Sequence, residues 1–290
     1  MRDYKLSGFI DEIAPDFETQ LRAASGLGLR YACLRDIDGK RIQRFAPAEI
    51  ETYIRPLLNQ YGIRVSCIGS AVGKIRLDDE AAYRQDLEDL PKICQAAERL
   101  GCKYIRLFSF YGAYSVTKEG WDAERPLVIE KMKGYLDAVK GYDVVLVHEN
   151  EKRIYGDSPE RCLDLFNELH DPQFRLIFDF ANFIQSGYEP LKCYERMKGT
   201  IEEFHIKDAF LGSGLVMPAG AGDGHVREIL QDAFDHGYDG FLSLEPHLNN
   251  AAAAERLKEH ALIPKSVEAS PEVTFAAAFS AIEKIMKEMK

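Results

Sequence analysis

Short apolar runs alternate with longer amphipathic stretches along the whole chain. Eight of the short runs are rich in Val, Ile, Leu and Phe, as is typical of buried β-strands. They cover residues 6–10, 30–34, 63–68, 103–108, 143–149, 174–180, 201–206 and 240–245. The intervening stretches have the period of helices and cover 16–26, 47–61, 80–100, 124–139, 158–169, 190–197, 225–234 and 271–289. The pattern therefore predicts eight strand–helix units.

Several of these stretches end at a glycine directly before the next strand, as in Leu-Gly-Cys-Lys-Tyr at 100–104. Glycine there supplies the left-handed backbone that ends a helix. Eight successive units without a linker predict a single (β/α)8 TIM barrel over residues 1–290. The alternative, an open doubly wound sheet, would need a glycine-rich loop after the first strand. Residues 9–13, Phe-Ile-Asp-Glu-Ile, contain no glycine.

Composition agrees with one barrel: the chain has 290 residues, of which 46% are apolar and 29% charged. We expect a cytoplasmic protein, because the start has no apolar signal core and charges interrupt every apolar run before it could span a membrane. The six cysteines form no C-x-x-C pair and are expected to be reduced structural thiols.

The formal net charge is −10, which would repel a nucleic-acid backbone. Nucleic acid is therefore not expected as the main partner, although a local basic cleft can override net charge. The sequence leaves the oligomeric state open, with a homo-oligomer among the options.

The fifth to eighth strands each end in a side chain that can ligate a metal: Glu149, Asp179, His205 and Glu245. In a barrel of this kind the chemistry lies where strands end and the following loops begin. Neighbouring strands are ~4.8 Å apart, so four such side chains at matching heights would converge. Three carboxylates and one imidazole suit one divalent ion, Mn²⁺ first, with Mg²⁺, Co²⁺ or Zn²⁺ as alternatives.

Alternation along the strands supports this arrangement. Val145, Val147, Ile177 and Ser243 share the parity of the neighbouring ligand residue and would fill the barrel interior. His148 has the opposite parity and is expected to face the helices. Glu203 shares the parity of His205, and the sequence offers no reason for a carboxylate there.

Each ligand residue alone also has a simpler interpretation. A carboxylate at a strand end can be the first polar residue of a loop or a helix cap, and His205 can be a hydrogen-bonded structural histidine. Four ionisable side chains in succession at the ends of apolar runs would be costly to bury unless something neutralised them. A metal ion does so, and we therefore favour the metal hypothesis.

At these residues the chain resembles the xylose isomerase-like superfamily, particularly its sugar phosphate isomerase/epimerase branch. Besides the four strand ends, the resemblance rests on HENEK at 148–152, HIKD at 205–208, PAGAGDG at 218–224 and GYDGFLSLEPH at 237–247. It implies a TIM-barrel enzyme that binds a metal through the four residues. It also implies that Glu149 and Glu245 exchange a proton with a sugar carbon beside a metal-chelated carbonyl.

The chain departs from the ketose 3-epimerases at two positions, with Asn182 and Glu151 where histidines are common. We expect Lys207, Arg106, Arg35, Glu12, Glu151 and Asn182 to contact a sugar or polyol. Arg35, Arg106 and Lys207 together could bind a phosphate, or each could form a loop salt bridge. The aromatic residues of 110–114 either form a wall over the ligand or pack on a helix.

Sugar isomerisation or epimerisation is the function that the sequence favours. A lyase reaction like that of inosose dehydratase, which shares the fold, is the alternative. An endonuclease for abasic DNA sites, which uses three zinc ions and several histidines, is less favoured because no histidine precedes His148. The last alternative is a non-catalytic sugar-binding protein.

Overall fold

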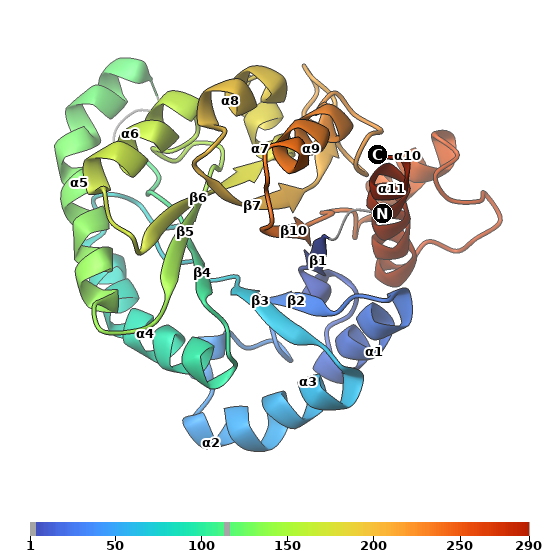
Figure 1. The fold of residues 1–290 in the computed structure, drawn as a ribbon, viewed down its shortest axis with the longest axis horizontal. Helices are drawn as coiled ribbons and strands as arrows, with labels where there is room; N and C mark the ends of the chain where they lie inside the picture. The colour runs from blue at the N-terminus through green and yellow to red at the C-terminus, as the bar shows by residue number, and fades with distance from the viewer. Residues whose placement is uncertain (1–3, 113–116, 290) are drawn as a thin grey trace.

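Eight parallel strands form a nearly closed ring with helices around it in the computed structural model, which describes residues 4–112 and 117–289 (Figure 1). The strands are β1 (Lys5–Gly8), β2 (Tyr31–Leu34), β3 (Arg64–Ile68), β4 (Tyr104–Leu107), β5 (Val145–Glu149), β6 (Phe174–Asp179), β7 (Ile201–Ile206) and β10 (Phe241–Leu244). Hydrogen bonds join them in the order β1-β10-β7-β6-β5-β4-β3-β2, and a bridge between Phe9 and Cys33 links β1 to β2. The predicted TIM barrel is confirmed, and the open doubly wound sheet is wrong.

The helices follow the strands in the predicted alternation. They are α1 (Phe17–Leu27), α2 (Pro47–Glu49), α3 (Arg55–Tyr61), α4 (Glu80–Arg99), α5 (Lys118–Val139), α6 (Pro159–Leu169), α7 (Phe180–Gln185), α8 (Pro190–Met197), α9 (Val226–Asp235), α10 (Ala251–Glu259) and α11 (Pro271–Glu288). A π-helical segment, η3 (Ile50–Ile54), joins α2 to α3, and short 3-10 turns form η1 (Ile10–Glu12) and η2 (Ile42–Arg44). The Ser158 side chain accepts a hydrogen bond from the Arg161 N–H and caps α6.

Helix α5 begins earlier than the stretch 124–139 that periodicity predicts. The Thr117 hydroxyl accepts a hydrogen bond from the Gly120 N–H and caps the helix there, and Pro126 lies inside it. The short elements that were not predicted include η1, η2, α7, α10 and a hairpin of β8 (Asp208–Ala209) and β9 (Val216–Met217). They lie in the loops after strands, where too few residues repeat for a helical or strand period to be read.

The barrel interior is apolar in its middle. Phe9, Cys33, Cys67, Val145, Val147 and Ile177 form one buried cluster there. Val145, Val147 and Ile177 thus face the interior as predicted, and His148 lies outside this cluster, 2.9 Å from the Ser109 hydroxyl. Glu203 on β7 pairs in register with Ile177 and places one carboxylate at this level, whereas Glu149, Asp179, His205 and Glu245 lie beyond it, toward the carboxyl ends of the strands.

The glycine-rich segment 218–224 is built around Asp208, the last residue of the HIKD motif. Its carboxylate accepts hydrogen bonds from the N–H groups of Gly220, Gly222 and Gly224 at 2.8–3.1 Å. A Cβ on Gly222 or Gly224 would lie 2.6 Å from Asp208 Oδ1. The two motifs therefore form one structural unit that closes the loop after β7.

The six cysteines are free and buried, which confirms the prediction of structural thiols. No helix within residues 4–112 and 117–289 is both long and apolar enough to cross a membrane.

Candidate metal centre

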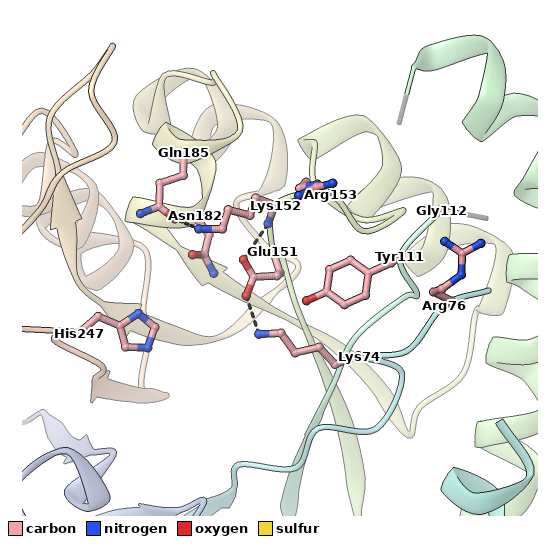
Figure 2. Close-up of a pocket in the computed structure, with 10 residues that line it drawn as sticks. All are labelled: Lys74, Arg76, Tyr111, Gly112, Glu151, Lys152, Arg153, Asn182, Gln185 and His247. Carbon is pink, nitrogen blue, oxygen red and sulfur yellow. Dashed lines mark hydrogen bonds and ion pairs between the residues drawn. The ribbon is translucent and has the colours of Figure 1, made fainter. Parts of the chain in front are cut away.

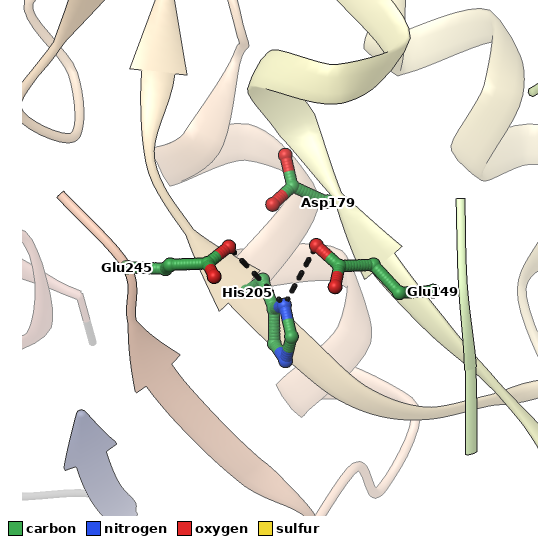
Figure 3. Close-up of side chains that lie close together, drawn as sticks. All are labelled: Glu149, Asp179, His205 and Glu245. Carbon is green, nitrogen blue, oxygen red and sulfur yellow. Dashed lines mark ion pairs between the residues drawn. The ribbon is translucent and has the colours of Figure 1, made fainter. Parts of the chain in front are cut away.

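The four predicted ligand residues converge at one end of the barrel (Figure 3). One ligand atom from each of Glu149, Asp179, His205 and Glu245 lies within 4.8 Å of the others. Asp179 on β6 pairs in register with His205 on β7, and Ser243 on β10 pairs with His205, two residues before Glu245. All four side chains are buried. The predicted convergence at matching heights is therefore present.

Three cations surround these carboxylates. Arg106 Nη1 lies 3.0 Å from Glu149 Oε2 and 3.1 Å from Glu245 Oε1. Lys207 Nζ lies 2.9 Å from Glu245 Oε2 and 3.0 Å from Asp179 Oδ2. Arg35 contacts Glu245, Asp11 and Glu12 at 2.7–3.2 Å. Arg35, Arg106 and Lys207 were predicted to contact the substrate. In the structure all three form ion pairs with carboxylates of the protein.

These neighbours shift the pKa values of the cluster in different directions. Burial and the charge of Glu245 favour the neutral form of Glu149, but His205 and Arg106 outweigh them and lower its pKa to about 2. At Glu245 burial also favours the neutral form, but the positive charges of Lys207 and His247 outweigh it and hold the pKa well below its usual range. Burial raises the pKa of Asp179 to about 7 despite the attraction of Lys207. The cluster is therefore not fully neutralised by the protein's own cations.

Unpartnered atoms test whether a metal ion fits. His205 Nδ1 and Nε2 and Asp179 Oδ2 are buried and form no well-aligned hydrogen bond with any described residue, although Lys207 Nζ lies 3.0 Å from Asp179 Oδ2. His205 Nδ1 faces Glu149 Oε1 at 3.1 Å and Glu245 Oε2 at 3.8 Å. Buried polar atoms without partners are rare in proteins, and acceptors that converge in this way suit a cation. The group could therefore hold a metal ion, with Nδ1 as the donor of His205.

The structure accounts for Glu203, which the sequence left unexplained. The Ser243 hydroxyl donates a hydrogen bond to Glu203 Oε1, and the same oxygen lies 3.8 Å from His205 Nε2. Glu203 is 1% exposed, and burial raises the pKa of its carboxyl. It therefore lies on the side of the imidazole opposite to the other ligands, where it can orient His205.

Two asparagines hold the candidate ligand residues Glu149 on β5 and Asp179 on β6 in place. The Asn150 side chain accepts a hydrogen bond from the Asp179 N–H and donates one to the Asp179 carbonyl. The Asn182 amide donates to Glu149 Oε1 at 3.1 Å and to the Asn150 carbonyl at 2.9 Å. Asn182 was predicted as a substrate contact, and the structure places it beside a ligand carboxylate. Asn150 was missed, although it directly follows Glu149 in the sequence.

The remaining predicted contacts lie at the edge of the group. Glu12 pairs with Arg35 and accepts a hydrogen bond from the His247 N–H at 2.7 Å. Glu151 pairs with Lys74 at 2.7 Å. Sequence analysis missed His247, which forms a second acidic group with Glu12 and Glu245. Its position two residues after Glu245 was the signal available.

The aromatic residues of 110–114 were expected either to cover the ligand or to pack on a helix, and each alternative holds for one of the described residues. Phe110 is buried and stacks on Tyr135 of α5 with ring centroids 5.6 Å apart, which is packing on a helix. Tyr111 lines a pocket beside the centre, as a wall over a ligand would. Residues 113 and 114 lie outside the described residues.

Comparisons with known proteins agree with this geometry. A model of the xylose isomerase-like TIM barrel family matches residues 21–267. Among curated proteins, inosose dehydratase of Geobacillus kaustophilus (strain HTA426) is 23% identical over 170 residues, which cover 53% of this chain and 53% of that protein. The match thus spans about half the length of the curated relative.

Two solved structures show the same fold over nearly the whole chain. The IolI protein with a bound zinc atom has a TM-score of 0.72 and 14% identity, and the match covers 99% of both chains. D-allulose 3-epimerase from Methylomonas sp., in complex with D-allulose, has a TM-score of 0.69 and 15% identity over 99% of this chain and 98% of that one. At such identities the likeness shows the fold alone. The family model covers most of the chain, and the protein belongs to the xylose isomerase-like TIM barrel family.

Proposed function

We propose that the protein is a divalent-metal-dependent isomerase or epimerase of a sugar or a related polyol. The observation that carries the proposal is the placement of two buried glutamates, Glu149 and Glu245, on either side of His205 (Figure 3). Two carboxylates that flank a substrate carbon can remove and return a proton on opposite faces. The relatives include an epimerase and a dehydratase, which supports an enzyme of this general class.

The roles of the residues follow from their contacts. Glu149, Asp179, His205 and Glu245 would hold the metal, and we favour Mn²⁺ because three of the four ligands are carboxylates. A divalent ion supplies Lewis-acid polarisation of a carbonyl and acidifies the neighbouring C–H. Arg106 lies within 3.1 Å of both Glu149 and Glu245, and Lys207 lies 2.9 Å from Glu245, so these cations keep the two glutamates in the ionised form that a general base needs.

Proton exchange in D₂O tests the proposal directly. The protein is stripped with EDTA, loaded with Mn²⁺, and incubated with a panel of ketoses while NMR follows loss of the C–H signal next to the carbonyl. We expect exchange with at least one sugar, and a loss of about 10²- to 10⁴-fold in Glu149→Gln and Glu245→Gln. Glu202→Gln is the matched control, because Glu202 lies on β7 but pairs with Tyr104 and Arg175 away from the centre.

Two results would count against the proposal. One is the absence of exchange with every sugar in a folded sample that contains stoichiometric metal. The other is full exchange activity of Glu149→Gln, which would show that Glu149 is not the base; a non-catalytic sugar-binding protein would instead bind the sugar without exchange, in the wild type and in Glu149→Gln alike.

A dehydratase is the second candidate, favoured by the match to inosose dehydratase. In that reaction the base removes a proton next to the carbonyl, and a hydroxyl on the next carbon takes up a proton and leaves as water. The product is a conjugated enone, so new ultraviolet absorbance with a cyclic ketose would favour this reaction over epimerisation.

A further inference from the structure

A basic pocket opens beside the candidate metal centre (Figure 2). It has a volume of about 560 Å³, within the range of small-molecule sites. Two lining residues connect it to the centre: Asn182 donates to Glu149 Oε1 at 3.1 Å, and His247 Nε2 lies 3.6 Å from Glu245 Oε1. A substrate held at Glu149 and Glu245 would therefore extend into this pocket.

The pocket lining is positively charged although the protein carries a net charge of −10. Lys74, Arg76, Lys152 and Arg153 line it together with a single carboxylate, Glu151. Lys74 pairs with Glu151 at 2.7 Å, and Arg76 pairs with Asp78 at 2.9 Å.

Two cations of this lining, Lys152 and Arg153, have no acidic partner for their side chains among residues 4–112 and 117–289. Lys152 Nζ lies 3.3 Å from the neutral Gln185 Oε1, and Arg153 forms no ion pair with any described residue. Both are exposed to solvent. Two positive charges are therefore available to a ligand in the pocket.

The backbone under these residues is fixed before any ligand binds. Tyr111 pairs with Arg76 on one side and with Ile154 on the other, which joins the loops after β3, β4 and β5. The Tyr111 N–H donates to the Ile75 carbonyl at 2.8 Å, and the Leu77 N–H donates to the Tyr111 carbonyl at 2.9 Å. A preorganised site loses less conformational entropy when a ligand binds.

We propose that this pocket binds an anionic group of the substrate, a carboxylate or a phosphate, through Lys152 and Arg153. The proposal rests on the proposed function, because it names the class of sugar or polyol that the centre would receive. Arg and Lys form charge-assisted hydrogen bonds with both anions, and Arg can bind either in a bidentate manner. The site differs from the phosphate site expected of Arg35, Arg106 and Lys207, which the structure pairs with carboxylates.

Binding of three matched ketoses tests the proposal: neutral D-fructose, D-fructuronate with a carboxylate at its far end, and D-fructose 6-phosphate. Isothermal titration calorimetry measures each Kd with the Mn²⁺-loaded and the EDTA-treated protein. We expect at least one anionic sugar to bind about tenfold or more tightly than D-fructose, also without metal. The tighter of the two anionic sugars identifies the group as carboxylate or phosphate.

Variants locate the effect. Lys152→Gln with Arg153→Asn should bring the Kd of the anionic sugar to that of D-fructose. Arg153 has a left-handed backbone with φ of 68°, which asparagine tolerates well, so this variant is expected to fold. Lys192→Gln with Arg196→Gln on α8 removes the same charge away from the pocket and should keep the preference. Arg153→Lys should keep most of it.

Equal affinity of the wild-type protein for all three sugars would overturn the proposal. So would a preference for the anionic sugar that survives in the Lys152/Arg153 variant. Because binding to the EDTA-treated protein is measured without turnover, failure of the proton-exchange assay alone would contradict the proposed function and leave this result independent.

Discussion

Substitution of Glu203 tests whether this residue supports metal binding by the candidate ligand His205 or only stabilises the fold. Glu203 Oε1 accepts a hydrogen bond from Ser243 and lies 3.8 Å from His205 Nε2, while Oε2 has no partner among the described residues. When a metal ion takes Nδ1 of a neutral histidine, the proton must be on Nε2. Glu203 is the carboxylate nearest to that proton, so it would orient the ring and increase the basicity of Nδ1.

The magnitude follows from what each substitution removes. Glu203→Gln keeps the volume and one acceptor oxygen but loses the charge, and Glu203→Leu loses both. Loss of a partner of this kind costs about 10- to 100-fold in metal affinity, or about 1.4–2.7 kcal/mol. We expect Glu203→Gln near the lower value and Glu203→Leu near the upper. The stability of the metal-free protein should not fall in Glu203→Gln, because a buried carboxyl whose pKa burial raises is replaced by a neutral group.

The assay is titration of EDTA-stripped protein with MnCl₂ by calorimetry, combined with urea denaturation of the metal-free protein. Glu202→Gln, at the neighbouring position of β7, serves as the control and should leave both quantities unchanged. Wild-type Mn²⁺ affinity in Glu203→Leu would refute the reasoning. A parallel loss of affinity and of metal-free stability would instead assign Glu203 a purely structural role.

Three further predictions concern the metal, the glycine loop and the thiols. Mn²⁺ at about 1,000 times its Kd should raise the free energy of unfolding by about 4 kcal/mol, as measured by denaturation with and without EDTA, and no shift would contradict a metal site in the folded state. Asp208→Ala removes the acceptor of the Gly220, Gly222 and Gly224 N–H groups and should lower the free energy of unfolding by about 3 kcal/mol or more in urea denaturation. A loss below about 1 kcal/mol would show that the loop is stable without these hydrogen bonds. All six cysteines are buried, and burial raises the pKa of Cys94 and Cys193 to about 12. A thiol reagent such as DTNB should therefore label none of the six in the native protein and all six in denaturant. Rapid labelling of the native protein would contradict their burial.

Much of the fold and the convergence of the four candidate ligand residues could be predicted from the sequence because both depend on local periodicity. Strand parity places Val147 and Glu149 on one face, and the strand end determines the height at which Glu149 emerges. Element boundaries were less predictable: α5 starts at Lys118 because Thr117 caps it, and a stretch with Pro126 near its start is also a normal helix beginning.

The partners of the charged residues could not be predicted, because they depend on distances between segments far apart in the chain. Arg106 on β4 contacts Glu245, and Arg35, which directly follows β2, contacts the same carboxylate. The charge of the pocket was equally hidden. Lys152 and Arg153 lie beside Glu151 in the sequence, but only the fold shows that Lys74 neutralises Glu151 and leaves the other two unpaired.

The charge balance of the centre connects these contacts to the proposed chemistry. Glu149, Asp179 and Glu245 face two buried cations, Arg106 and Lys207, and Glu245 also pairs with Arg35, whose charge is shared with Asp11 and Glu12. A divalent ion bound there would add fixed positive charge beside these buried carboxylates. Positive charge that is fixed in advance stabilises an oxyanion as it forms, which is the demand of proton abstraction next to a carbonyl. Arg106 and Lys207 therefore serve best as permanent parts of the centre, and this leaves recognition of a substrate anion to Lys152 and Arg153 in the pocket.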